Sequence, residues 1–205
     1  KIKCVIGGNY GFPACEINDP GKNGVIILEL SSYQLDGAKQ LSLDLATITN
    51  ITKDHLDYHE TFKNYKFSKL KIINFLKENG TFILDSDDKF LNETVTDKNL
   101  KSINIIKTKK NETYNFVNDN DYLQGAHNAS NSSIAVSIAK HLNIKPEKIS
   151  LAVNNFKGLP HRMEPLYTSD RIKIINDSKS TNGVSTAAAL KSFENVFWIA
   201  GGQPK

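Results

Sequence analysis

The stretch VIILELSSYQL occupies residues 25–35, and its first half decides the fold class. Residues 25–30 form an almost unbroken apolar run, and LATITN at residues 45–50 forms a second one. Such runs predict strands that are buried on both faces, as in a parallel sheet covered by helices. Further short runs rich in Val and Ile predict strands at residues 3–6, 81–84, 102–106, 171–175 and 195–200.

Helical patterns alternate with these strands. Between residues 60 and 79 apolar side chains recur at helical spacing, and Asn79-Gly80 predicts the C-terminal stop. Further helices are predicted at residues 129–142, at residues 145–156, where Pro146 opens the helix, and at residues 186–193. This alternation predicts an α/β fold with a mostly parallel sheet flanked by helices.

Two segments depart from the alternation. Residues 97–122 are polar and rich in Asn, and we interpret them as an antiparallel edge region. FKGLPHRMEPLY at residues 156–167 breaks the pattern with Gly158 and Pro160, and a new strand-turn-strand begins at Arg162. We therefore predict a domain boundary near Gly158, with one domain at residues 1–158 and a second at 159–205.

Composition excludes several classes of protein. The chain has 205 residues, a net charge of +4 and scattered lysines, so it does not predict nucleic-acid binding. The longest apolar run is too short to span a bilayer, and no signal peptide is visible. Cys4 and Cys15 lack a metal-type spacing, which favours free thiols in a reducing compartment. We expect a cytoplasmic protein without nucleic-acid or membrane partners.

Candidate functional residues fall where strands end, which is where parallel α/β folds place their ligand sites. Glu29 is a carboxylate in an apolar strand, so it is expected to be paired or bound to a cation, unless it simply faces water. His55 has Asp54 and Asp57 beside it, and imidazole and carboxylate groups suit a divalent metal. A structural or surface histidine is the alternative. Lys69 lies in the predicted helix, where spacing alone favours an exposed lysine.

Two polar segments suit anionic ligands. GAHNASNSS at residues 125–133 opens a helix, whose N-terminus attracts anions, although Asn128 and Asn131 alternatively serve as helix caps. INDSKSTN at residues 175–182 places a lysine beside a small hydroxyl residue after a strand, which suits a phosphate or carboxylate. A solvated loop is the alternative for this second segment.

Other patterns are less specific. A metallohydrolase built on His55, Asp57 and His59 stays open, although His59 is equally consistent with an exposed side chain. GGNYG at residues 7–11 and AGGQPK at residues 200–205 are glycine turns that let a ligand approach the backbone. No G-x-x-x-x-G-K-[ST] phosphate loop is present in the sequence.

Taken together and in order, these segments resemble the Mur ligase family of peptidoglycan synthesis, and within it the branch that adds D-glutamate. One such match would be weak, but the order holds over nearly the whole chain. The family also includes other amino-acid ligases and folylpolyglutamate synthase, from which amino-acid selectivity would separate this chain. The matching segments are GGNYGFPA, LELSSYQL, TNITKDHLDYH, YKFSKLKI, GAHNASNSSIA, FKGLPHRME, INDSKSTN and AGGQPK.

The resemblance implies an ATP-dependent amide ligase that adds D-glutamate to UDP-N-acetylmuramoyl-L-alanine through an acyl-phosphate. It implies a central ATP-binding domain at residues 1–158, without its N-terminal phosphate loop, and the start of a C-terminal Rossmann-like ligase domain at 159–205. Both ends are expected to continue in a longer protein, which is expected to be a monomer. We expect the 205 residues alone not to turn over, and a non-catalytic nucleotide-binding fragment is the alternative.

The resemblance also implies roles for individual residues. Glu29 and His55 are implied to hold two Mg²⁺ ions, and Lys69 is implied to be carbamylated, because a lysine cation would repel the metal and burial would favour the neutral amine. Lys179 is an implied phosphate contact and, with His55 and Lys69, an implied catalytic residue. The implied ATP-binding residues are His127, Asn128, Asn131, Arg162 and Asp177, and the implied substrate-binding residues are Asn9 and Ser31 for the nucleotide sugar and Thr181 and Lys205 for D-glutamate.

Overall fold

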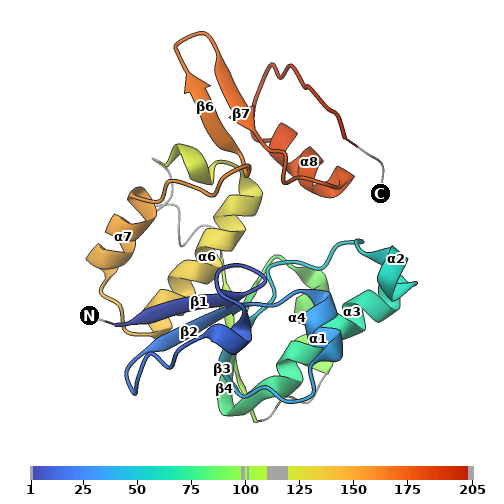
Figure 1. Ribbon diagram of the computed structural model, residues 1–205, viewed down its shortest axis with the longest axis vertical. Helices are drawn as coiled ribbons and strands as arrows, with labels where there is room; N and C mark the ends of the chain where they lie inside the picture. Colours follow the sequence, from blue (N-terminus) through green and yellow to red (C-terminus); the bar gives the residue numbers. More distant parts are fainter. Residues whose placement is uncertain (1, 98–99, 101, 110–119, 203–205) are drawn as a thin grey trace. The chain divides into compact units, whose positions relative to one another are not determined.

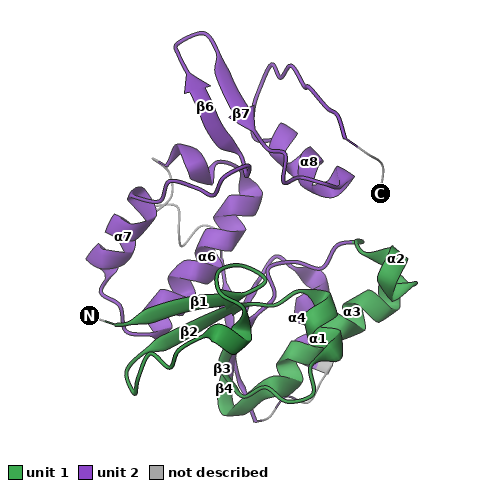
Figure 2. Ribbon diagram, viewed as in Figure 1, with its two compact units in different colours: residues 1–46, 53–80 green, residues 47–52, 81–205 purple. Residues whose placement is uncertain are grey.

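The computed structural model describes residues 2–97, 100, 102–109 and 120–202. Figure 1 shows the helices and strands coloured along the sequence, and the chain forms two compact units (Figure 2). Unit 1 contains residues 1–46 and 53–80, and unit 2 contains residues 47–52 and 81–205. The domain boundary near Gly158 stays a prediction.

Unit 1 begins with a pair of parallel strands, as predicted. β1 (Cys4–Gly8) pairs with β2 (Val25–Glu29), and Gly8 lies opposite Glu29. A short 3-10 helix, η1 (Ala14–Glu16), lies between the two strands in the chain. The expectation that β2 is buried on both faces is wrong, because Ile26 and Ile27 are 47% and 49% exposed. Within the described residues β1 and β2 form a sheet of only two strands, which leaves apolar strand surface in contact with water.

The helices of unit 1 are short. They are α1 (Ser32–Gly37), α2 (Leu56–His59), α3 (Phe62–Leu70) and η2 (Lys71–Phe75). The predicted helix over residues 60–79 is therefore too long, and Asn79-Gly80 is not a helix stop. Both residues lie inside a strand, because the chain after Phe75 takes hydrogen-bond partners in a sheet.

That strand, β4 (Leu76–Asp85), is the central one of a three-stranded sheet in the order β3-β4-β5. β3 spans Leu43–Thr47 and β5 spans Asn104–Thr108. The second half of β4 is the core of unit 2, since Phe82, Ile83 and Leu84 are all 0% exposed. A strand buried on both faces is typical of parallel sheets covered by helices, so the predicted α/β fold class is confirmed.

The predicted antiparallel edge at residues 97–122 is wrong where the structure describes it. β5 pairs with β4 in parallel, from Thr81 opposite Asn104 to Asp85 opposite Thr108. Residues 98–99, 101 and 110–119 lie outside the described part of the chain. The sequence analysis also missed α4 (Lys89–Asp97), whose Leu91 is fully buried.

The rest of unit 2 follows the predicted order more closely. A 3-10 helix, η4 (Asp121–Leu123), precedes α6 (Ala126–His141) and α7 (Pro146–Asn154). The predicted strand-turn-strand is confirmed as an antiparallel pair of β6 (Glu164–Thr168) and β7 (Lys173–Asn176), which α8 (Gly183–Leu190) follows. No strand forms at residues 195–200, where Phe197 and Ile199 are 99% and 96% exposed. An apolar segment becomes a strand only where another strand pairs with it, so this prediction is wrong.

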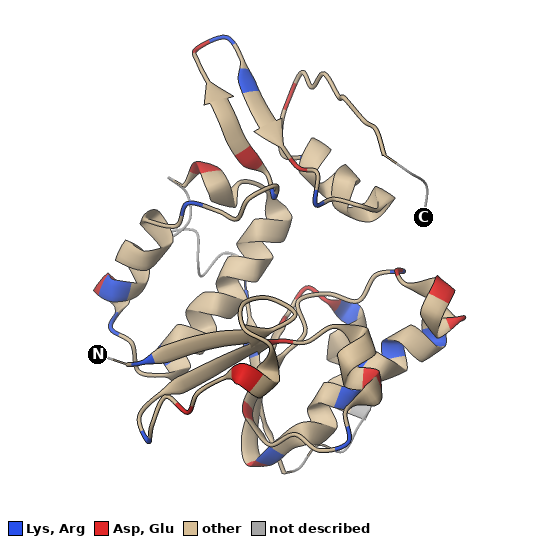
Figure 3. Ribbon diagram, viewed as in Figure 1, with Lys and Arg blue, Asp and Glu red and all other residues tan. Residues whose placement is uncertain are grey.

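Acidic and basic residues are interspersed along both units rather than gathered in blocks of one sign (Figure 3). Cys4 and Cys15 are exposed free thiols. None of the helices that the structure describes combines the length and the hydropathy needed to cross a bilayer.

Candidate active site

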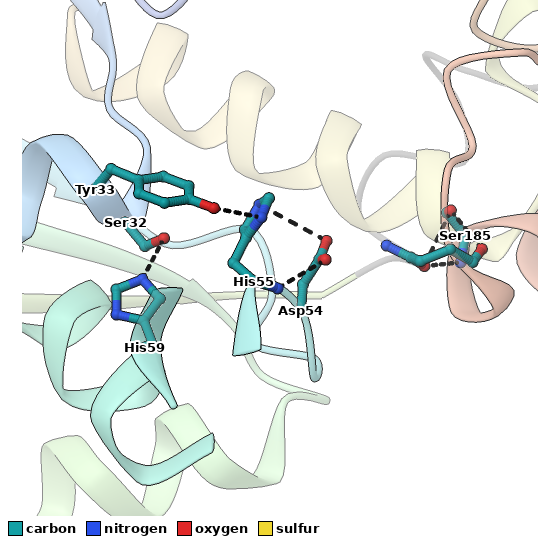
Figure 4. Close-up of polar contacts among 7 residues, drawn as sticks. Ser32, Tyr33, Asp54, His55, His59 and Ser185 are labelled. Atoms are coloured by element: carbon teal, nitrogen blue, oxygen red, sulfur yellow. Dashed lines mark hydrogen bonds and ion pairs between the residues drawn. The ribbon is translucent and has the colours of Figure 1, made fainter. Parts of the chain in front are cut away.

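His55 lies in the left-handed backbone region, with φ 53° and ψ 36°, directly before α2. This conformation costs a non-glycine residue about 1–3 kcal/mol and persists only where neighbouring groups fix it. Here the backbone N–H of His55 donates a 2.9 Å hydrogen bond to Asp54 Oδ1. The imidazole lies with Nδ1 3.0 Å from the Tyr33 hydroxyl and Nε2 3.8 Å from Asp54 Oδ2 (Figure 4).

Tyr33 is positioned by the tightly held start of α1. Ser31 is the N-cap of this helix, and it forms a reciprocal capping box with Gln34. The next residue, Ser32, is buried, and its hydroxyl lies 2.9 Å from Nε2 of the buried His59 (Figure 4). The hydroxyl of Ser68 on α3 donates to the Ser32 carbonyl at 2.7 Å. α1 is thereby hydrogen-bonded to both α2 and α3, which holds the Tyr33 ring in place.

Aromatic rings surround the two histidines. The Tyr33 ring centroid lies 5.0 Å from that of His55, 4.5 Å from that of Tyr58 and 5.7 Å from that of His59. Tyr65 stacks edge-on against His59 at 5.4 Å. Burial raises the pKa of the Tyr33 phenol, and the nearby carboxylates of Asp57 and Asp54 raise it further, so this hydroxyl keeps its proton at neutral pH.

Lys69 joins this cluster from α3. It is half-buried, and its Nζ lies 5.3 Å from the centroid of the Tyr65 ring. Desolvation by burial lowers the pKa of the Lys69 amine, while the Asp54 carboxylate opposes that shift. The amine is therefore neutral more often than that of an ordinary lysine. The expectation from spacing alone that Lys69 is an exposed lysine is therefore wrong.

Glu29 ends β2 on the surface of unit 1. Its Oε1 accepts a 3.2 Å hydrogen bond from Asn9 Nδ2, and its backbone carbonyl accepts one from the Asn9 N–H at 2.7 Å. The last residue of β1 must be glycine, because φ at Gly8 is +99° and a Cβ there would lie 2.3 Å from the Glu29 carbonyl oxygen. Glu29 thus both faces water and has a polar partner, and its role as a metal ligand stays a prediction.

The metallohydrolase alternative is not supported. His59 is only 5% exposed and turns toward Ser32, which corrects the expectation that it is an exposed side chain. In the described part of the chain no three His, Cys, Asp or Glu side chains gather as a metal-binding group. A cation beside His55 and Asp54 would therefore need further oxygen ligands. Mg²⁺ commonly binds one or two protein carboxylates and takes its other ligands from substrate phosphates and water, so the Asp54 carboxylate beside His55 is compatible with the ion.

In unit 2, α6 begins earlier than predicted and without an asparagine cap. Gly125 is the N-cap, with φ +92°, and a Cβ at this position would lie 2.2 Å from Ser192 Oγ. Asn128 and Asn131 lie inside the helix, so the helix-cap alternative for them is wrong. Asn128 instead donates its side-chain amide back to the Gln124 carbonyl at 3.0 Å.

The structure brings three of the expected ATP-binding residues together. Asn128 Nδ2 lies 3.8 Å from the sulfur of the buried Met163, whose backbone N–H donates to Asp177 Oδ1 at 3.0 Å. Asp177 also accepts a 2.5 Å hydrogen bond from the Ser180 hydroxyl. Burial lowers the pKa of the His127 imidazole, and the Asp177 carboxylate opposes that shift, so the ring is neutral at neutral pH. These contacts join the start of α6 to the segment after β7.

The other candidates of unit 2 are exposed. Arg162 precedes Met163 and its side chain faces water, as does Asn131 on α6. Lys179 and Thr181 are exposed in the loop after β7, and the backbone N–H of Lys179 donates to the His161 carbonyl at 3.0 Å. Lys205 lies outside the described residues.

Two polar groups near these sites were missed by the sequence analysis. Tyr33 carried no signal, because its partner His55 is distant in sequence and only the fold joins them. The other is Asp85, which is 4% exposed and accepts a hydrogen bond from Ser130 on α6. Its position at the carboxyl end of a predicted strand was a signal that could have identified it.

Comparison with known proteins gives a consistent family. Residues 16–145 match the model of the "Mur ligase middle domain". A curated relative from Zymomonas mobilis, named UDP-N-acetylmuramoylalanine--D-glutamate ligase, is 35% identical over 100% of this chain and 46% of its own length. A relative of the same name from Bacillus cereus is 35% identical over 97% of this chain and 48% of its own length. The chain spans about half the length of the curated relatives it matches.

Solved structures agree on the fold. The superposition on a crystal structure of MurF from Acinetobacter baumannii covers 85% of this chain and 43% of the MurF chain, with a TM-score of 0.63 and 18% sequence identity. The superposition on MurF ligase from Thermotoga maritima, solved in complex with ADP, covers 93% of this chain and 51% of the MurF chain, with a TM-score of 0.62 and 15% sequence identity. At these identities the likeness concerns the fold alone.

Proposed function

This chain belongs to the Mur ligase family, and from that membership we propose that it is part of an ATP-dependent ligase that joins D-glutamate to UDP-N-acetylmuramoyl-L-alanine. The relatives that carry this activity in their name match 97–100% of the chain, but the match covers only 46–48% of their own length. The activity is therefore proposed for the full-length protein. The observation that supports it most is the half-buried Lys69 amine, whose pKa is lowered by burial in spite of the opposing Asp54 carboxylate.

The proposed reaction forms one amide bond at the expense of ATP. An oxygen of the alanyl carboxylate attacks the γ-phosphorus, the bond to the ADP oxygen breaks, and an acyl-phosphate results. The amine of D-glutamate then attacks the acyl carbon, phosphate leaves with the bonding electron pair, and the amine loses a proton. Bound Mg²⁺ would neutralise the phosphate and carboxylate charges that this reaction brings together.

Unit 1 contributes the proposed metal ligands and the contacts to the nucleotide sugar. His55 and a carbamylated Lys69 would hold one Mg²⁺, and Glu29 would hold the other. A carbamate forms when the neutral amine attacks carbon dioxide and loses a proton, so the lowered pKa of Lys69 favours it. Ser31 and Asn9 are proposed to contact the nucleotide sugar from the start of α1 and the turn after β1.

Unit 2 contributes the proposed nucleotide and amino-acid contacts. His127, Asn128 and Asn131 on α6, together with Arg162 and Asp177, are proposed to bind ATP. The hydrogen bonds that join Asn128 to Met163 and Met163 to Asp177 support a shared role. Lys179 is proposed to contact phosphate, and Thr181 and Lys205 are proposed to receive D-glutamate.

The remaining expectations belong to the same proposal. The domain boundary near Gly158, with an ATP-binding domain before it and a ligase domain after it, follows the family resemblance. A cytoplasmic location is supported by the two exposed free thiols, which are typical of a reducing compartment. A monomeric full-length protein is proposed, and sedimentation of the purified protein tests it.

Phosphate release from ATP by the full-length protein tests the function. The assay contains Mg²⁺, bicarbonate and UDP-N-acetylmuramoyl-L-alanine, with D-glutamate, another amino acid or none. We expect release that depends on D-glutamate and is lost in Lys69→Ala. The matched control is Lys63→Ala, because Lys63 is an exposed lysine on the same helix. Release that prefers another amino acid would assign the protein to another ligase of the family, and no release with any of them would refute the proposal.

A further inference from the structure

We propose that Tyr33 is a positioning residue for His55: its hydroxyl oxygen accepts a hydrogen bond from Nδ1–H, which leaves the lone pair of Nε2 to bind a divalent cation. The inference rests on the proposed magnesium role of His55 and adds a residue that this role requires. It is carried by the 3.0 Å contact between the Tyr33 hydroxyl and Nδ1 (Figure 4).

The geometry around the imidazole is asymmetric. Nδ1 faces a hydroxyl at hydrogen-bonding distance, whereas Nε2 lies 3.8 Å from Asp54 Oδ2, longer than a hydrogen bond. The His55 side chain remains 36% exposed, so an ion has a path to the ring. Asp54 is already engaged by the His55 backbone N–H through its other oxygen, Oδ1. A cation bound to Nε2 would therefore also lie close to the Asp54 carboxylate.

If a cation binds Nε2, the chemistry of imidazole makes Tyr33 a hydrogen-bond acceptor. A neutral imidazole has one N–H and one nitrogen lone pair, so a cation on Nε2 requires the proton on Nδ1. Histidines that bind metals almost always donate this second N–H to an acceptor, and loss of the acceptor typically costs 10–100-fold in affinity. Tyr33 is the group that lies opposite Nδ1, and a phenol oxygen can accept while its own proton points elsewhere.

The scaffold explains why this contact is held rigidly. The capping box at Ser31 and the two hydrogen bonds of Ser32 fix the start of α1. His55 is fixed in turn by its left-handed backbone and its bond to Asp54. Both partners are therefore placed before any ligand arrives, which is what a preorganised metal ligand needs.

The test compares Tyr33→Phe with Tyr58→Phe in the full-length protein. Tyr33→Phe keeps the ring that packs against His55 and removes only the hydroxyl. Tyr58→Phe is the matched control, because Tyr58 belongs to the same aromatic cluster but its hydroxyl donates to Asp36 Oδ2 at 3.3 Å. Two quantities are measured with Mg²⁺ alone: the tautomer of His55, from ¹⁵N NMR of labelled histidine, and the apparent Mg²⁺ affinity. A His55→Gln spectrum assigns the His55 signals.

We expect wild-type protein with Mg²⁺ to carry the proton on Nδ1, and Tyr33→Phe to lose this single tautomer and to bind Mg²⁺ roughly tenfold more weakly or worse. Tyr58→Phe is expected to leave both quantities unchanged. A wild-type spectrum with the proton on Nε2 would overturn the inference without any variant. So would a Tyr33→Phe protein that matches wild type in both quantities. Neither measurement uses D-glutamate, so the inference and the proposed function can fail separately.

Discussion

The Ser32–His59 contact holds α1 to α2, and replacing Ser32 by alanine should destabilise the whole site. Ser32 is 3% exposed and His59 is 5% exposed, and the hydroxyl lies 2.9 Å from Nε2. Removing the hydroxyl leaves a buried imidazole nitrogen without a partner, which typically costs about 1–3 kcal/mol. We expect a loss near the middle of that range, about 2 kcal/mol in the free energy of unfolding, or roughly 30-fold in the folding equilibrium constant.

Urea unfolding followed by circular dichroism measures this loss as a lower midpoint at unchanged slope. The matched control is Ser102→Ala, because Ser102 is exposed and its substitution should change the free energy by no more than about 0.5 kcal/mol. A double-mutant cycle adds two further variants: His59→Phe, and the double variant that combines Ser32→Ala with His59→Phe. In the double variant both polar groups are gone, so its loss should be smaller than the sum of the single losses.

Two results would refute this reasoning. Ser32→Ala could unfold at the same urea concentration as Ser102→Ala, which would mean that the buried nitrogen needs no partner. Alternatively, the two single losses could add fully in the double variant, which would mean that Ser32 and His59 contribute independently. Either result would also remove the basis for calling the start of α1 a rigid support for Tyr33.

Three further predictions follow from the pKa shifts and the glycine turn. Carbamate on Lys69, detected by NMR with ¹³C-bicarbonate, should increase as pH rises toward the lysine's lowered pKa, because only the neutral amine reacts. In Asp177→Asn the pKa of His127, measured by NMR titration, should fall further, because the carboxylate that opposes the burial shift is gone. Gly8→Ala should lower the free energy of unfolding by more than about 1 kcal/mol, because the Cβ would clash at φ +99°, whereas a Cβ at Gly37 has open space.

Each of these has a control and an opposing result. Lys63→Ala should keep the carbamate signal and Lys69→Ala should lose it; a signal that survives without Lys69 would contradict the assignment. A rise in the His127 pKa in Asp177→Asn would show that the carboxylate does not favour the charged ring. For Gly8, equal urea midpoints of the Gly8→Ala and Gly37→Ala variants would show that the turn tolerates a side chain.

The sign of the His127 shift also gives a stability effect. Burial lowers the pKa of this ring below 6.5, so the folded state binds fewer protons than the unfolded state when the pH is acidic. The stabilisation from a neutral His127 is fully present above the unfolded value and is lost as pH falls through the folded pKa. Unfolding midpoints measured from pH 7 downward should therefore fall less steeply in His127→Gln than in wild type.

Sequence patterns succeeded where the deciding interactions are local. Pro146 opens α7 as predicted, because its fixed φ suits the first turn of a helix. The strand-turn-strand after Arg162 appears as β6 and β7. The order of motifs was sufficient to identify the family, since that order is a property of the chain itself.

Sequence patterns failed where the partner is distant in the chain. Leu76 continues the helical spacing of the predicted helix, yet it begins β4, because strands β3 and β5 supply hydrogen bonds that a local pattern cannot anticipate. His59 and its neighbour His55 read as one metal motif, yet one is buried against Ser32 and the other faces Tyr33.

The sequence by itself determined the α/β class, the order of most elements and the residues available for chemistry. The tertiary structure alone decided their states: the desolvated amine of Lys69, the hydroxyl opposite His55 and the contacts that join Asn128 to Asp177 through Met163. The physical reason is that burial and hydrogen-bond partners depend on which distant segments meet. Those two quantities set a side chain's charge and orientation, and spacing along the chain reports neither.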